Sequence, residues 1–122
     1  MKILVVDDSA AMRMIVKKTL RDAGYDGHDV TEAADGAIAL EAIKADRPDL
    51  VLCDWNMPNM TGPELLEALN DENIRPSFGF VTTEATPAMR EHAEELGARF
   101  LIAKPFTPMS FNEALDPYLG GQ

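Results

Sequence analysis

Four short apolar runs in this chain of 122 residues are each followed at once by side chains that suit ionic chemistry. In chain order, the runs end in Asp7-Asp8, Asp54, Thr82-Thr83 and Lys104-Pro105. If the runs are parallel strands, their carboxyl ends share one edge of the sheet, where open α/β sheets bind ligands. An acid or a threonine after one strand often only caps a helix or forms a turn. Four coincidences at one edge indicate a functional site.

The chemistry of these groups points to magnesium and phosphate. Three crowded carboxylates raise one another's proton affinity unless a hard cation holds them ionised. Mg²⁺ prefers oxygen ligands in octahedral geometry and keeps several waters, so two carboxylates and a backbone carbonyl suit it. A carboxylate can attack phosphorus to give an acyl phosphate. Lys104 would neutralise the phosphoryl charge, and the Thr82 hydroxyl could donate to a phosphoryl oxygen.

Zinc and thiol chemistry are not favoured by the sequence. His28 and His92 each stand apart from other metal-binding side chains, so we interpret them as surface or packing residues. Cys53 is the single cysteine and lies inside an apolar run. It cannot form an internal disulfide, and we expect a buried small hydrophobic residue there.

The composition indicates one compact domain. With 122 residues, 46% of them hydrophobic and 26% charged, the chain can bury a core but has no room for an effector domain, so we predict a single domain over residues 1–122. A formal charge of −10 argues against binding nucleic acid or anionic membranes. The first apolar run, Ile3 to Val6, is too short for a signal peptide or a membrane span, so we expect a cytoplasmic protein.

The elements that must position the site alternate along the chain. Short apolar runs are separated by helical stretches of about a dozen residues, which is typical of βαβ units and a parallel sheet. We therefore predict five strands and five helices. The predicted strands are Lys2 to Val6, Asp29 to Ala33, Leu50 to Cys53, Phe78 to Val81, and Phe100 to Ala103.

Capping residues predict where the helices begin. Ser9 suits the start of the first helix, and Thr61 with Glu64 forms a capping box for the third. The pairs Thr86-Pro87 and Thr107-Pro108 place a capping hydroxyl before a proline at the first helical position. The pair Asp35-Gly36 is compatible with a hairpin turn, but the following apolar residues recur at helical spacing and favour a capped helix.

Apolar periodicity predicts the buried faces. For the first helix the inward residues are Met12, Ile15, Val16, Leu20 and Ala23, with Gly24 suited to a left-handed stop. For the fourth they are Met89, Ala93 and Leu96, with a stop at Gly97. For the fifth they are Phe111, Ala114, Leu115, Tyr118 and Leu119. Pro117 should kink or fray the end of that helix because it lacks an amide hydrogen.

The spacing of the rim residues resembles the receiver domain of two-component response regulators. The stretches from Asp54 to Gly62 and from Val81 to Ala85 are similar to stand-alone chemotaxis receivers in particular. The resemblance covers essentially the whole chain. It implies a doubly wound, flavodoxin-like α/β fold with a five-stranded parallel sheet of order 2-1-3-4-5. It also implies a cis peptide bond at Lys104-Pro105, which is far less costly before proline than elsewhere.

The resemblance assigns a role to each rim residue. Asp54 corresponds to the phosphoacceptor, with Thr82 as the switch hydroxyl and Lys104 as the phosphate-binding lysine. Asp7 and Asp8 correspond to the acids that hold Mg²⁺, and Asn56 to the position that lends its backbone carbonyl to the metal.

The resemblance also implies partners. They are a sensor histidine kinase or phosphotransfer protein and a downstream target such as the flagellar switch. The resemblance implies a monomer that binds this target at the fourth helix, fifth strand and fifth helix. The protein would catalyse only its own phosphorylation and dephosphorylation, in chemotaxis or a related phosphorelay, and is not classed as an enzyme.

One position departs from the family pattern. Leu101 stands three residues before Lys104, where chemotaxis receivers usually carry an aromatic switch residue. Strand alternation places the neighbouring Phe100 on the opposite face. Trp55, Asn56 and Glu84 flank the site on the solvent side, either to tune water access or as plain loop residues.

Three other functions remain to be weighed against a signalling receiver. A phosphate sink would drain a kinase and have no output partner. A small Mg²⁺-dependent aspartyl phosphatase of the haloacid-dehalogenase type would begin Asp-x-Asp after the first strand, which Asp7-Asp8-Ser9 does not match. A flavodoxin-like cofactor binder would favour Gly, Ser and Thr in that same loop.

Overall fold

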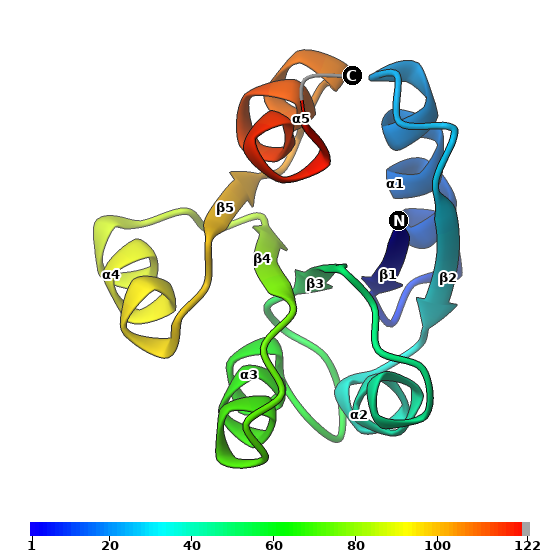
Figure 1. The fold of residues 1–122 in the computed structure, drawn as a ribbon. Helices are drawn as coiled ribbons and strands as arrows, with labels where there is room; N and C mark the ends of the chain where they lie inside the picture. The colour runs from blue at the N-terminus through cyan, green and yellow to red at the C-terminus, as the bar shows by residue number, and fades with distance from the viewer. Residues whose placement is uncertain (121–122) are drawn as a thin grey trace.

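Five parallel strands form the central layer in the computed structural model, which describes residues 1–120 (Figure 1). The sheet order is β2-β1-β3-β4-β5, which confirms the predicted doubly wound topology. Each strand pairs in parallel with its neighbours. The strands are β1 (Lys2–Val6), β2 (Asp29–Ala33), β3 (Leu50–Asp54), β4 (Ser77–Thr82) and β5 (Phe100–Ala103).

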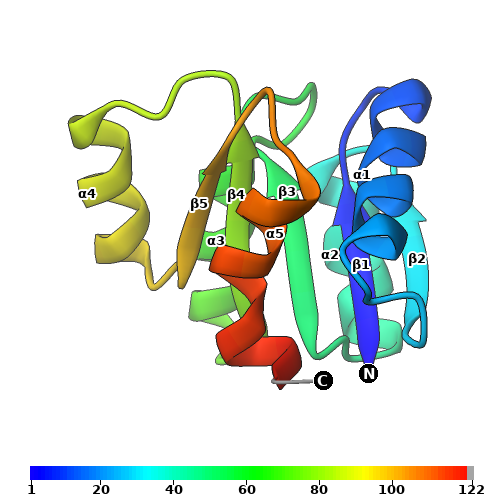
Figure 2. The same ribbon diagram turned by 90° about the horizontal axis from the view of Figure 1, so that it is seen from above.

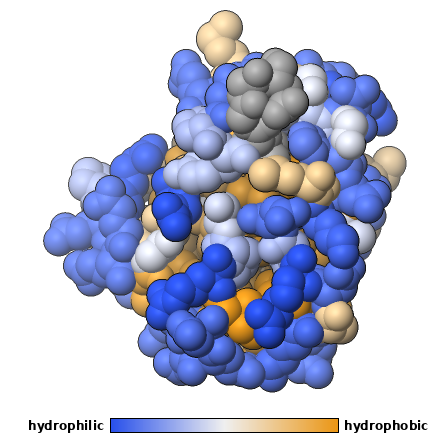
Figure 3. Space-filling view, viewed as in Figure 1, coloured by the Kyte–Doolittle hydropathy of each residue, from blue (hydrophilic) through white to orange (hydrophobic). Residues whose placement is uncertain are grey.

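Helices cover both faces of the sheet (Figures 1 and 2). One face carries α1 (Ala10–Asp22) and α5 (Pro108–Leu115). The other face carries α2 (Gly36–Ala45), α3 (Gly62–Asp71) and α4 (Pro87–Leu96). Hydrophilic residues dominate the face drawn in Figure 3, and the apolar side chains lie mainly between the layers.

Strand alternation divides the interior into two cores. In β1, Ile3 and Val5 join the core under α1 and α5, whereas Leu4 and Val6 join the core under α2, α3 and α4. All four are at most 3% exposed, because a central parallel strand is covered on both sides. This two-sided burial explains why the runs in β1 and β3 are continuously apolar, whereas the edge strand β2 is not. Phe100 and Leu101 pack against opposite cores, as the alternation predicts.

The predicted helix caps are confirmed. The Ser9 side chain accepts a hydrogen bond from the Met12 amide, and both arms of the Thr61 capping box are formed. Asp35 accepts from the Ile38 amide at 2.8 Å, so the Asp35-Gly36 pair begins a helix and not a hairpin. Thr86 and Thr107 cap α4 and α5. Gly24 and Gly97 have φ values of 97° and 95°, the left-handed conformation expected after a helix.

The predicted inward face of α1 is wrong at one position. Ile15 is 49% exposed, whereas Val16, Thr19 and Leu20 are buried. Ile15 lies one residue, or roughly 100°, away from the stripe centred on Val16 and Leu20. Thr19 tolerates burial because its hydroxyl donates to the Ile15 carbonyl at 2.8 Å.

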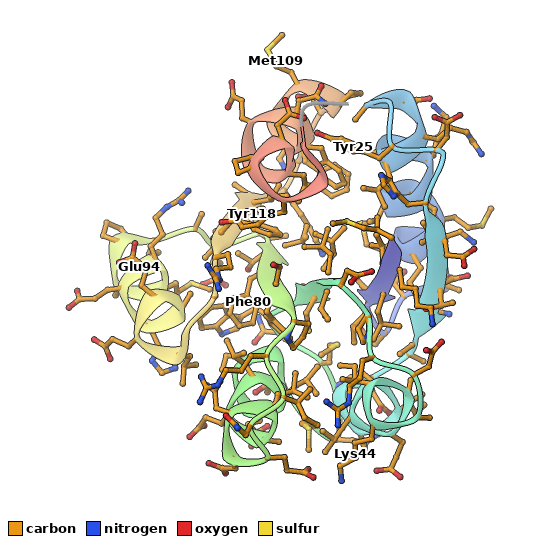
Figure 4. The ribbon with its side chains drawn as sticks, viewed as in Figure 1. Tyr25, Lys44, Phe80, Glu94, Met109 and Tyr118 are labelled. Carbon is orange, nitrogen blue, oxygen red and sulfur yellow. The ribbon has the colours of Figure 1, made fainter. Side chains whose placement is uncertain are left out.

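The end of α5 breaks where Pro117 predicts it. The α-helix stops at Leu115, and residues 116–120 continue as a wider π-helical turn. Phe111 and Leu115 are buried, and the Tyr118 ring lies 5.6 Å from the Phe100 ring, against β5 (Figure 4). The predicted burial of the Leu119 side chain lies outside what the structure describes.

The position of the Phe100 ring over β4 depends on Gly79. A Cβ atom at this position would lie 2.0 Å from the Phe100 ring. We predict that Gly79→Ala lowers the free energy of unfolding by roughly 1–3 kcal/mol, because the ring must leave its place. Gly27→Ala is the matched control, since nothing lies within 4 Å of its Cβ position. Urea denaturation measures both; equal stability of the two variants would show that the ring moves freely.

Candidate functional site

The three predicted acids meet at the carboxyl edge of the sheet. One ligand oxygen from each of Asp7, Asp8 and Asp54 lies within 4.8 Å of the other two. The strand register brings two of these acids together. Val6 of β1 pairs with Cys53 of β3, so the residues that follow them, Asp7 and Asp54, lie side by side. Asp7 is 4% exposed, Asp54 is partly buried and Asp8 is exposed.

Lys104 brings a positive charge to the acids from the far strand. It follows β5, and its Nζ lies 3.3 Å from Asp54 Oδ1 and 3.5 Å from Asp7 Oδ2. Its backbone amide donates to the Thr82 carbonyl at 2.7 Å, which fixes the end of β5 against β4. The Lys104-Pro105 peptide bond is cis, as predicted.

Burial makes the ionised form of Asp54 costly. Loss of solvent raises the pKa of its carboxyl above the usual value, and the neighbouring Asp7 charge raises it further. The ammonium of Lys104 and the Trp55 amide, which donates to Asp54 Oδ1 at 2.9 Å, act in the opposite direction. The pKa of Asp54 is raised on balance. The positive charge of Lys104 therefore does not offset the combined effect of burial and of the Asp7 charge.

Two residues support Asp7 from α1 and the preceding loop. The Ser9 amide donates to Asp7 Oδ1 at 2.9 Å, and Arg13 Nη1 donates to the Asp7 carbonyl at 2.6 Å. The Arg13 guanidinium also forms an ion pair with Glu32, with 3.0 Å between Nε and Oε1. The role of Arg13 was not predicted from the sequence. The available signal was an arginine four residues after the capping serine, near the start of the helix that follows Asp7 and Asp8.

Thr82 and Asn56 also lie at the carboxyl edge of the sheet. Among residues 1–120, neither side chain forms a hydrogen bond with Asp54. Thr82 is 1% exposed at the end of β4, and its Oγ1 accepts from the Glu84 amide at 3.2 Å. Asn56 is exposed in the loop between β3 and α3. The structure therefore brings together Asp7, Asp8, Asp54 and Lys104, and places Thr82 and Asn56 beside them.

Trp55 is more than a solvent-side loop residue. Its ring is partly buried and lies 4.7 Å from the Phe80 ring and 5.9 Å from the His92 ring. Asn56 and Glu84 are exposed, as predicted. Phe80 is fully buried between the sheet and its helices (Figure 4), so Trp55 links the site to the core.

The remaining candidates pack as predicted. Cys53 is buried, and loss of solvent raises the pKa of its thiol well above the usual value, so the thiol is inert. His28 packs near Tyr25, with 6.5 Å between the ring centroids, and His92 is exposed on α4.

The donor set suits a hard divalent cation. The three acids offer only oxygen atoms, and with Lys104 they leave an excess of negative charge where the pKa of Asp54 is raised. A cation with oxygen-only preference, such as Mg²⁺, matches both the ligand type and the charge.

Among residues 1–120 no helix is long and apolar enough to cross a membrane.

Comparison with known proteins agrees with this geometry. Residues 3–116 match the response regulator receiver domain, and the chain belongs to this family. The chemotaxis protein CheY1 of Helicobacter pylori is 42% identical over 98% of this chain and 98% of its own length. CheY-3 of Vibrio cholerae is 42% identical over 95% of this chain and 89% of its own length. The solved structure of Vibrio cholerae CheY4 has a TM-score of 0.83 at 36% identity, covering 96% of this chain and 97% of that one.

The raised pKa of Asp54 predicts a stability effect. Folding strengthens proton binding at Asp54, so its ionised form destabilises the folded protein above the raised pKa. Without Mg²⁺ at pH 7, Asp54→Asn should therefore be more stable than the wild type, because the amide carries no charge that burial penalises. This difference in the free energy of unfolding should disappear as the pH falls through the raised pKa of Asp54, because the wild-type carboxyl then becomes neutral as well.

Urea denaturation in EDTA across pH values measures this gap. Asp71→Asn, at an exposed position on α3, is the control and should change the free energy of unfolding by less than about 0.5 kcal/mol. An Asp54→Asn variant less stable than the wild type at pH 7 would show that the attraction to Lys104 exceeds the cost of burial.

Proposed function

We propose that this receiver accepts a phosphoryl group on Asp54 from a sensor histidine kinase or phosphotransfer protein, in a Mg²⁺-dependent reaction, and signals to a partner protein. The observation that carries the proposal is the convergence of Asp7, Asp8 and Asp54 on Lys104 at one rim of the sheet. Three acids suit a divalent cation, and the lysine suits an incoming anion.

In the proposed phosphoryl transfer, different residues bind the metal, attack phosphorus and bind the phosphoryl group. Asp7, Asp8, Asp54 and the Asn56 backbone carbonyl would hold Mg²⁺, which supplies positive charge to the transferring phosphoryl oxygens. A carboxylate oxygen of Asp54 attacks phosphorus, the bond from phosphorus to the donor nitrogen breaks, and an acyl phosphate forms. Lys104 pairs with the phosphoryl charge. The Thr82 hydroxyl donates to a phosphoryl oxygen after leaving the Glu84 amide.

Output would proceed through α4, β5 and α5. Movement of Thr82 pulls on the loop that leads from β4 into α4. A groove of about 600 Å³ lies on this face, lined in part by Arg90 of α4, Leu101 of β5 and Ser110 of α5. Leu101 packs with the core on the α4 side, so aliphatic repacking would replace the usual aromatic swing. The relatives are chemotaxis proteins, which favours a target in chemotaxis, such as the flagellar switch.

The setting follows from the same proposal. The protein would act as a monomer in the cytoplasm. A phosphate sink predicts no partner retained by the beryllofluoride-bound form in a pull-down. An aspartyl phosphatase predicts turnover of a small phosphomonoester by the purified protein.

Phosphorylation of Asp54 is tested by intact-mass measurement. With a small phosphodonor and Mg²⁺, the wild type should gain one phosphoryl group, which hydroxylamine removes because an acyl phosphate is labile to nucleophiles. Asp54→Asn should gain none, and the wild type in EDTA should label at least about a hundredfold more slowly, as expected for loss of a principal electrostatic group. Full labelling of Asp54→Asn would refute the assignment.

A further inference from the structure

The loop between β3 and α3 is held against the start of α2 by a polar contact that lies outside the acid cluster. Asn59 Nδ2 donates to Asp35 Oδ2 at 2.9 Å. The other oxygen of Asp35 accepts from the Ile38 amide at 2.8 Å and caps α2. These two bonds lower the pKa of the Asp35 carboxyl, the Ile38 amide contributing most. A single buried carboxylate therefore joins the helix to the loop.

The backbone conformation of Asn59 is the left-handed one, which asparagine tolerates. Its φ is 68°, in the left-handed region that asparagine adopts more readily than most side chains. Next to it, the chain touches α2 directly, because a Cβ on Gly36 would lie 2.7 Å from the Met60 carbonyl oxygen. Polar and steric contacts thus fix the same side of the loop.

The rest of the loop is fastened at both ends. The Trp55 amide donates to Asp54 Oδ1 at 2.9 Å, and the Gly62 amide donates to the Trp55 carbonyl at 2.9 Å. Met57 is 7% exposed and joins the core. Asn56, exposed between Trp55 and Met57, is thereby confined by fixed residues on both sides.

We propose that Asp35 and Asn59 are positioning residues for the metal site, and that their hydrogen bond holds the loop so that the Asn56 carbonyl is preorganised for Mg²⁺. The inference rests on the proposed function, because it takes the Asn56 carbonyl as a metal ligand. Partners outside the ligand shell commonly set metal affinity by fixing the ligands they support. Neither Asp35 nor Asn59 belongs to the cluster of acids that would hold the metal.

Asn59→Gly isolates this hydrogen bond. Glycine adopts φ near 68° without strain, so the variant removes the amide while it keeps the backbone accessible. Asn73→Gly is the matched control, because Asn73 also has a positive φ, 59°, but lies beyond the end of α3. Calorimetry and Trp55 emission, which reports charge brought beside Asp54, both give the Mg²⁺ dissociation constant.

We expect Asn59→Gly to weaken Mg²⁺ binding by about tenfold, and Asn73→Gly to stay within about twofold of the wild type. The double variant Asp35→Asn with Asn59→Asp keeps the net charge and allows the same bond with donor and acceptor exchanged. It should recover binding to within about threefold of the wild type, which a general loss of stability would not do.

Three results would overturn the inference. One is an Asn59→Gly affinity within twofold of the wild type, and another is a double variant no better than Asn59→Gly. Either would leave the metal site itself standing. The third is a wild type that binds no Mg²⁺, which would remove the proposed metal site together with this inference and so is distinguishable from the first two.

Discussion

The electrostatic imbalance at the carboxyl edge of the sheet is the constraint on which the rest of the site depends. Three carboxylates face one ammonium group, and burial raises the pKa of Asp54 despite Lys104 at 3.3 Å. Such a site favours a cation first, and only the cation and Lys104 together can then favour a phosphoryl anion. In the proposed function, the cation therefore binds before the anion on grounds of charge alone.

The sheet makes this imbalance possible and keeps it in place. β1 and β3 are adjacent, so Asp7 and Asp54 emerge side by side, while β4 separates β3 from β5. Lysine is long enough to cross that gap from β5, and Thr82 lies on the strand between. Because these strands are covered on both faces, adaptation of the site is left to the loops. The contact between Asp35 and Asn59 restrains one of those loops.

The sequence predicts most of this arrangement because strong local signals agree. Continuous apolar runs, capping residues such as Ser9 and Thr61, and Gly97 in the left-handed conformation each specify an element or its end. Ile15 was misplaced because an apolar side chain at the margin of a helical stripe carries no signal of which neighbour covers it. The contact between Asp35 and Asn59 was not predicted because a pairing across 24 residues depends on tertiary packing. Arg13 lies only six residues from the Asp7 carbonyl, so its local signal was available but was overlooked.

The central claim is that cation and phosphoryl anion occupy this site as a linked pair. The most direct test is to measure the affinity for beryllofluoride, a phosphoryl mimic, at a series of Mg²⁺ concentrations. Linkage requires each ligand to tighten the other by the same factor, here at least about tenfold. If beryllofluoride binds equally well in saturating Mg²⁺ and in EDTA, Lys104 alone suffices for the anion, and the three acids do not act through a cation.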